Sequence, residues 1–247
     1  MRFSRKMILC AAGCCAFFFS HNKGVALHQS HEYVRDQLEL KSYSQEEIIP
    51  LLPLIQEWAA RDFLNYPYLW VAPEEEVFSG FSLYINEQSG MGAVVKKQGQ
   101  VVGIALGLAF DCEGMQALFG DLEATHGKSL NDKVKEKGFD PSRIIYMSLF
   151  LTAPEYRNDP EIVELLYNRF VDFAHAMGRN QLCYFEDART LETDLKPENP
   201  IPIEPWGYVI HGFRSMNIRL DLRWNTLQSD GSSKEQFHTS EFFVKDI

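Results

Sequence analysis

The chain has 247 residues, of which 45% are hydrophobic and 23% charged, and its formal net charge is −10. These proportions are those of a globular protein, and about 200 residues behind a leader fit one domain better than two small ones. The first 26 residues contain four basic groups and no acid, so the rest of the chain carries −14. Such acidity argues against a nucleic-acid partner and is compatible with a cationic or amine substrate.

The N-terminus has the three parts of a secretory signal. A basic stretch, residues 1–6, precedes an apolar run of 13 residues at 7–19, and small residues follow at Gly24 and Ala26. The run is short for a membrane-spanning helix. We expect residues 1–26 to be a signal peptide or an N-terminal anchor, with membrane association through residues 7–19 and the protein exported or membrane-anchored. The alternatives are a lipoprotein signal at Cys14 and a cytoplasmic protein with a mis-assigned start.

The cysteines and histidines lack the spacing of metal ligands. Three of the five cysteines lie in the leader, which leaves Cys112 and Cys183. In an exported protein these two could form one disulfide, and otherwise they are buried thiols. The seven histidines are scattered and form no HExxH motif. We therefore predict no metal site.

A strand and a helix are the first predicted elements. Residues 37–43 alternate apolar and polar side chains, as a strand does. Ser44 and Glu47 have the spacing of a capping box, and an apolar run with helical periodicity follows them. Because proline breaks a helix interior but suits its first turn, Pro50 and Pro53 predict a bent turn and a regular helix from about Pro53.

An aromatic-rich stretch, residues 66–81, follows this helix. It predicts a short helix and loop packed on a sheet, or an aromatic lid over a substrate pocket. Two strands then flank a turn at Gln98-Gly99, which is a strong hairpin signal. Residues 112–142 are polar and mostly helical in pattern, and we interpret them as an insertion between strands.

The remaining elements alternate between strands and helices. Residues 143–152 are apolar enough for a buried strand, and residues 160–177 keep helical spacing up to Gly178, which suits a helix C-cap. A strand at 180–188 and a short helix near residues 207–213 follow. The chain then ends in a predicted hairpin, whose two strands are residues 217–228 and 235–247 and whose turn is "SDGSS". The sequence therefore predicts one α+β domain over residues 27–247, with a central mixed sheet and helices on both faces.

Four stretches in this order resemble the GNAT superfamily of N-acetyltransferases. "VKKQGQVVGIALG" (95–107) resembles the family's second and third strands, and "MSLFLTAPEYR" (147–157) resembles the strand that enters the acetyl-CoA motif. "YVIHGF" (208–213) matches the family's Tyr-x-x-x-Gly-Phe element, and "FFVKDI" (242–247) resembles the last strand of many members. The similarity extends over roughly residues 38 to 247.

The resemblance implies a GNAT-like fold and acetyl transfer from acetyl-CoA to an amine of a small molecule or a protein. In the family, a splayed fourth strand offers its backbone to the pantetheine arm, and the loop and helix start that follow receive the pyrophosphate. The corresponding cofactor-binding residues here are Leu149, Phe150, Leu151, Arg157, Asn158, Asp159, Glu161 and Ile162.

The resemblance also implies catalytic residues. The tyrosine of the Tyr-x-x-x-Gly-Phe element, here Tyr208, often protonates the leaving thiolate in the family. Glu186 or Asp187, at the end of the strand after the cofactor helix, is the candidate base by position. The structural alternatives are packing of Tyr208 under the short helix, a solvated strand end at Glu186 and Asp187, and an ion pair between Arg157 and a surface carboxylate.

The pyrophosphate loop departs from the family pattern. The family has Arg or Gln, two residues, Gly, one residue, and Gly or Ala, whereas this chain has Pro160 and Ile162 at the two small positions. Pro160 lacks an N–H group, and Asp159 is expected to cap the helix start with its own carboxylate. Asp159 and Glu161 also add negative charge where the pyrophosphate would lie. The alternative function is therefore a catalytically inactive GNAT-fold protein that binds a ligand or a protein partner.

Overall fold

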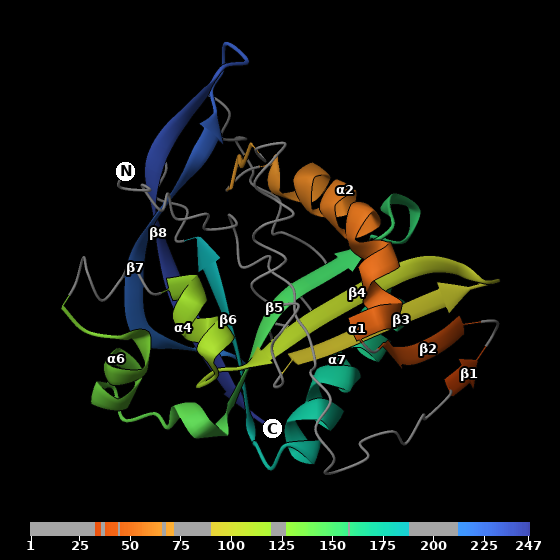
Figure 1. The fold of residues 1–247 in the computed structure, drawn as a ribbon, viewed down its shortest axis with the longest axis horizontal. Coiled ribbons are helices and arrows are strands. Elements are labelled where there is room, and N and C mark those ends of the chain that lie inside the picture. Colours follow the sequence, from red (N-terminus) through yellow and green to blue (C-terminus); the bar gives the residue numbers. More distant parts are fainter. Residues whose placement is uncertain are drawn as a thin grey trace.

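One eight-stranded sheet, with strand order β1-β2-β3-β4-β5-β6-β8-β7, organises the protein (Figure 1). The computed structural model describes residues 33–35, 38–43, 45–65, 68–71, 90–119, 127–157, 159–187 and 212–247. The predicted leader, most of the aromatic-rich stretch and residues 207–211 of the predicted short helix lie outside these residues. Within them, no helix combines the length and the apolar character needed to cross a membrane.

The N-terminal elements match the predicted strand and bent helix. β1 (Tyr33–Arg35) and β2 (Leu38–Tyr43) are antiparallel, and β2 pairs with β3. α1 (Gln45–Ile48) and the 3-10 turn η2 (Ile49–Leu51) precede α2 (Leu52–Phe63), which has proline in its first turn. This confirms the bent start that Pro50 and Pro53 predict. The predicted cap residue Ser44 lies outside the described residues.

β3 (Gly90–Lys97) and β4 (Gln100–Ala109) form the predicted hairpin in the middle of the sheet. Gln98 and Gly99 connect them, with φ angles of 51° and 78°. Two consecutive residues with positive φ are typical of the type I′ turn, whose twist matches that of the flanking strands. The prediction of the hairpin from Gln98-Gly99 is therefore confirmed.

The insertion between β4 and β5 is helical where the structure describes it. It contains α4 (Glu113–Phe119), α6 (Leu130–Glu136) and the 3-10 turn η3 (Pro141–Arg143). Ser129 caps α6 by accepting a hydrogen bond at Oγ from the Asp132 N–H (3.2 Å). Apolar residues of α2, α4 and α6 share one core cluster with one face of the sheet, so these helices cover that face.

α7 (Pro160–Ala176) follows β5 (Ile144–Thr152) and precedes β6 (Gln181–Asp187) in the chain. It covers the opposite face of the sheet, where it packs on β3, β4, β5 and β6. A 3-10 turn, η4 (Pro154–Tyr156), precedes it. The helix packs closely on β4 because Gly103 and Gly107 have no side chains; a Cβ at Gly107 would lie 2.6 Å from Cε1 of Phe170. Gly178, with φ 68°, follows the end of the helix as predicted.

The C-terminal hairpin is longer than the sequence predicts. β7 (Arg214–Leu227) and β8 (Ser233–Asp246) pair along their length, and the end that carries their turn projects beyond the rest of the sheet (Figure 1). β8 lies between β6 and β7, so the last strand of the chain is interior and β7 is at the edge. Near the far end of the hairpin, the buried His238 ring stacks on Trp224 at a centroid distance of 3.6 Å.

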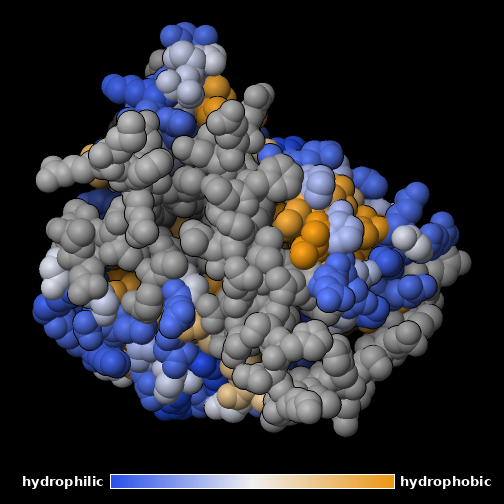
Figure 2. All heavy atoms as spheres, in the orientation of Figure 1, coloured by the Kyte–Doolittle hydropathy of each residue, from blue (hydrophilic) through white to orange (hydrophobic). Residues whose placement is uncertain are grey.

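The predicted α+β class, with a mixed sheet and helices on both faces, is confirmed. All neighbouring strands are antiparallel except β5 and β6, which are parallel. Figure 2 shows apolar side chains over α2 among hydrophilic surroundings. Of the two outcomes predicted for the cysteines, the disulfide is not formed: Cys183 is a buried thiol, as predicted, whereas Cys112 is a half-buried thiol. Burial raises the pKa of Cys183 well above its ordinary value.

Candidate functional site

β5 and β6 part from each other after three residues. Their register joins Ile144 to Gln181, Ile145 to Leu182 and Tyr146 to Cys183, and no later pair of the two strands is joined. β5 continues to Thr152 and β6 to Asp187, and Figure 1 shows the two arrows diverging from a common base. The predicted splaying of the strand that precedes the cofactor loop is therefore present. It leaves one side of β5 without a neighbouring strand among the described elements.

A β-bulge at Ser148 lies where β5 starts to diverge. Leu106 of β4 is opposite Leu149 and Gly107 is opposite Met147, so Ser148 is the extra residue. Bulges bend a strand and change which way its backbone groups point, and they are common beside active sites. The local sequence gives no signal for this bulge, because "MSLFL" is compatible with a regular strand.

The bulge decides which backbone groups of β5 face the gap. Beyond it, the Ala153 N–H donates to the Val102 carbonyl of β4 (3.0 Å). Hydrogen-bonding direction alternates along a strand, so Leu149 and Leu151 also direct their backbone groups towards β4. Phe150 and Thr152 direct theirs towards the gap. Of the three residues predicted to contact pantetheine, Phe150 thus directs its backbone groups towards the gap and Leu149 and Leu151 do not. Thr152, which the sequence analysis does not single out, also directs its backbone groups there.

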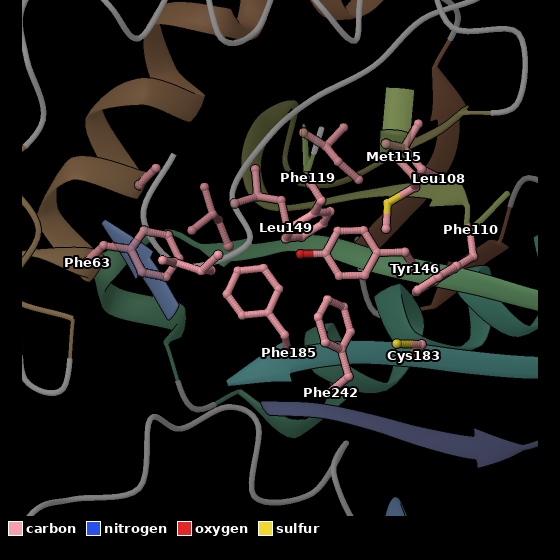
Figure 3. Packing of buried hydrophobic residues seen from close by; sticks show 14 of the residues in the cluster. Phe63, Leu108, Phe110, Met115, Phe119, Tyr146, Leu149, Cys183, Phe185 and Phe242 are labelled. Carbon is pink, nitrogen blue, oxygen red and sulfur yellow. The ribbon is translucent and has the colours of Figure 1, made fainter. Parts of the chain in front are cut away.

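Four aromatic rings gather at the base of the gap, on the face of the sheet that α2 and α4 cover (Figure 3). Tyr146 of β5 stacks on Phe185 of β6, with ring centroids 6.1 Å apart and an interplanar angle of 7°. Phe119 of α4 and Phe242 of β8 contact both rings. The four side chains are buried. These four rings, here called the aromatic floor, lie where the strands begin to part.

The loop between β5 and α7 caps its own helix, as the sequence predicts. The Asp159 carboxylate accepts hydrogen bonds at Oδ1 from the N–H groups of Glu161 (3.0 Å) and Ile162 (3.4 Å). Pro160 occupies the first turn, and the Ile162 side chain is buried. The amides that an anion would use at this helix start therefore already have an internal acceptor. Asn158 lies outside the described residues.

Arg157 forms an ion pair with Asp62 at the end of α2. The Asp62 carboxylate also accepts a bidentate pair of hydrogen bonds from Arg61, at 2.7 Å from Nε and 3.0 Å from Nη2. Arg61 Nη2 in turn donates to the Thr152 carbonyl (3.0 Å). The alternative prediction for Arg157, pairing with a carboxylate, is what the structure shows. Sequence reasoning missed Arg61 and Asp62 because they precede Arg157 by more than 90 residues.

Glu186 lies on the sheet face that α7 covers. It has the same strand parity as Leu182 and Tyr184, which belong to the core cluster under α7, and its backbone partner on β8 is Glu241. Hydrogen bonds from Ser215 and Arg219 lower the pKa of Glu241 from its ordinary value. Glu186 and the aromatic floor are thus on opposite faces of the sheet.

Two other expectations for the site have no structural test. Tyr208 lies outside the described residues, so its predicted role stays a prediction. In the part of the chain that the structure describes, no three or more histidine, cysteine or acidic side chains are grouped so that they could hold a metal ion.

The strand order, the parting of β5 from β6 and the long C-terminal hairpin make this a GNAT-like fold, as the sequence resemblance implies. No protein-family model matches the chain, and no curated protein sequence does. Several solved structures are similar to it. A putative acetyltransferase from Salmonella typhimurium, solved with acetyl-CoA, has a TM-score of 0.47 at 11% identity, over 85% of this chain and 94% of that one.

Two more of these structures have similar values. A putative acetyltransferase from Acinetobacter baylyi has a TM-score of 0.48 at 10% identity, with 87% of this chain and 94% of that chain covered. The ribosomal-protein-S18-alanine N-acetyltransferase from Escherichia coli has a TM-score of 0.45 at 11% identity, with 85% and 94% covered.

Proposed function

We propose that the protein binds acetyl-CoA along the open side of β5 and transfers the acetyl group to an amine. The observation that carries this proposal is the parting of β5 from β6 beyond the Ser148 bulge, with the backbone of Phe150 and Thr152 directed into the gap. An extended chain with amide groups can add to a sheet edge through backbone hydrogen bonds. The pantetheine arm of coenzyme A, which contains two amide groups, has this chemistry.

Different residues around the gap would bind different parts of acetyl-CoA. Phe150 and Thr152 would hold the arm through their backbones, and the aromatic floor of Tyr146 and Phe185 would exclude water beneath it. Arg157 and Arg61, at the outer end of the gap, would meet the phosphates. Acetyl-CoA supplies the activated thioester, whose carbon–sulfur bond breaks as the bond to the amine nitrogen forms.

Transfer also requires two proton movements. A base must take a proton from the acceptor's ammonium group so that the neutral amine can attack, and an acid must protonate the leaving thiolate. We propose Tyr208 as the acid, by its place in the Tyr-x-x-x-Gly-Phe element, and Glu186 as the base. Because Glu186 lies on the α7 face, it would act on an acceptor that approaches the gap from that face or through a bridging water. The acceptor is a small-molecule or protein amine, and the acidic chain favours a cationic one.

A binding measurement and a transfer assay test this function. The full chain is heated with and without millimolar acetyl-CoA, because a ligand that binds only the folded state raises the melting temperature. Release of free coenzyme A is then measured over a panel of polyamines, amino acids and N-terminal peptides. We expect a raised melting temperature and thiol release with at least one amine. A folded protein with neither response would contradict the proposal.

A second candidate, a GNAT-fold binding protein without catalysis, is favoured by the loop itself. Asp159 holds the helix amides and Asp62 holds Arg157, so both anion-binding elements have internal partners. Loss of acetyl-CoA binding would be expected in a descendant that acts outside the cytosol, where this metabolite is absent. We also propose export or membrane anchoring through residues 1–26, which cell fractionation with an antibody against the chain would test. Thiol release from acetyl-CoA by the purified protein would rule this candidate out.

A further inference from the structure

Two arginines from separate elements converge on one carboxylate at the outer end of the gap. Arg61 lies in the last turn of α2 and binds both oxygens of Asp62, whereas Arg157 follows β5 and η4 and contacts Oδ1 of the same carboxylate. The Asp62 side chain is 15% exposed, and the two arginine side chains are 30% and 41% exposed. The carboxylate is thus more buried than either cation, and both arginine side chains are partly exposed to solvent.

The same cluster reaches the open side of β5. Arg61 Nη2 contacts both Asp62 and the carbonyl of Thr152, which is directed into the gap between β5 and β6. The three charged side chains therefore connect the end of α2 to the end of β5 and to the loop that precedes α7. A ligand lying along β5 from Phe150 outwards meets this connection at Thr152.

Paired guanidinium groups are well suited to a diphosphate. Each presents a planar fork of N–H donors that matches two oxygens of a phosphate or a carboxylate. A carboxylate that already accepts hydrogen bonds from both guanidinium groups is a competitor for such a ligand. Because Asp62 is next to Arg61 in the chain and its side chain is largely buried, it competes at a high effective concentration.

We propose that Asp62 is an internal competitor that occupies the diphosphate-binding pair Arg61 and Arg157 and lowers the affinity of the site for phosphorylated ligands. The identification of acetyl-CoA as one such ligand rests on the proposed function, but the competition itself does not. Binding of a diphosphate displaces the Asp62 carboxylate from Arg157 and releases the connection between α2 and the β5–α7 loop.

Isothermal titration of the full chain with inorganic pyrophosphate, and separately with acetyl-CoA, tests the competition. The variant Asp62→Asn keeps the size of the side chain and removes its charge. We expect it to bind pyrophosphate on the order of ten-fold more tightly than the wild type, which corresponds to about 1.4 kcal/mol. The matched control is Asp172→Asn, which removes the same charge from an exposed ion pair with Arg169 on α7. Its affinity should equal that of the wild type.

Two further variants distinguish loss of the competition from a folding defect of Asp62→Asn. Asp62→Ser removes the carboxylate in another way and should tighten binding like Asp62→Asn, and adding Arg157→Leu to Asp62→Asn should abolish the gain. Unchanged or weaker pyrophosphate binding in both folded Asp62 variants overturns the competition, as does an equal gain in Asp172→Asn. If the Asp62 variants gain pyrophosphate affinity but no amine is acetylated, the competition stands and the proposed enzyme function fails. If the wild type acetylates an amine but the Asp62 variants bind pyrophosphate no more tightly, the proposed enzyme function stands and the competition fails.

Discussion

Gly107 of β4 lies directly against the ring of Phe170 of α7, and no side chain fits between them. A Cβ at position 107 would come within 2.6 Å of Phe170 Cε1 and 3.1 Å of the Tyr146 carbonyl oxygen. Phe170 is fully buried, so its ring has little space into which it could move. This contact holds α7 close to β4.

The variant Gly107→Ala should therefore lower the free energy of unfolding. Overpacking a well-filled core typically costs about 1–3 kcal/mol. Urea denaturation of the wild type and the variant measures the difference. In the background of Phe170→Leu, which removes the ring, the same substitution should cost clearly less, because the two sites are in contact and their effects are not additive. An equal cost in both backgrounds would show that the clash is not with Phe170.

Asp159→Ala should destabilise the start of α7. The carboxylate accepts hydrogen bonds from the N–H groups of Glu161 and Ile162, and loss of an N-cap costs about 1 kcal/mol. Asp159→Ser keeps a capping oxygen without the charge and should restore most of the stability. Thermal or urea unfolding compares the three proteins. If the serine variant is as unstable as the alanine variant, capping is not the role of Asp159.

The features of the fold that could be predicted from the sequence are those that depend on residues close together in the chain. The turn at Gln98-Gly99, the proline-bent entry to α2 and the Asp159 cap all follow from local chemistry, and each is present. The resemblance to a known family adds the splayed strand, which periodicity alone does not indicate. What the sequence could not show depends on contacts between distant residues. The ion pair of Asp62 with Arg157 and the bulge at Ser148 arise only when α2, β4 and β5 are brought together.

Glu241 should make the stability of the sheet depend on acid pH. Hydrogen bonds from Ser215, and then Arg219, hold the pKa of this carboxyl below its usual value of about 4.3. A group whose folded pKa is depressed stabilises the protein above its unfolded pKa, and this contribution is lost as the pH falls through the folded pKa. Glu241→Gln should therefore be less stable than the wild type at pH 7, and the difference should shrink below about pH 4.

Urea midpoints of the two proteins at pH 7, 5, 4 and 3 measure this dependence. Glu235→Gln is a suitable control, because Glu235 pairs with Arg223 at the exposed end of the same hairpin. A difference in urea midpoint between the wild type and Glu241→Gln that stays constant down to pH 3 would contradict a lowered pKa of Glu241.

Tyr208→Phe should lower the turnover of acetyl transfer if the tyrosine protonates the leaving thiolate. The phenylalanine keeps the ring and removes the proton donor, and the loss of a general acid typically costs about 10²–10⁴-fold in rate. The affinity for acetyl-CoA should change little, because the substitution removes a group needed in the transition state rather than in binding. Tyr167→Phe, on α7, where the Lys245 ammonium group lies over the ring, is the matched control and should leave the rate unchanged. Steady-state kinetics with the best amine acceptor decides between the roles: an unaltered turnover in Tyr208→Phe would remove this residue from the mechanism.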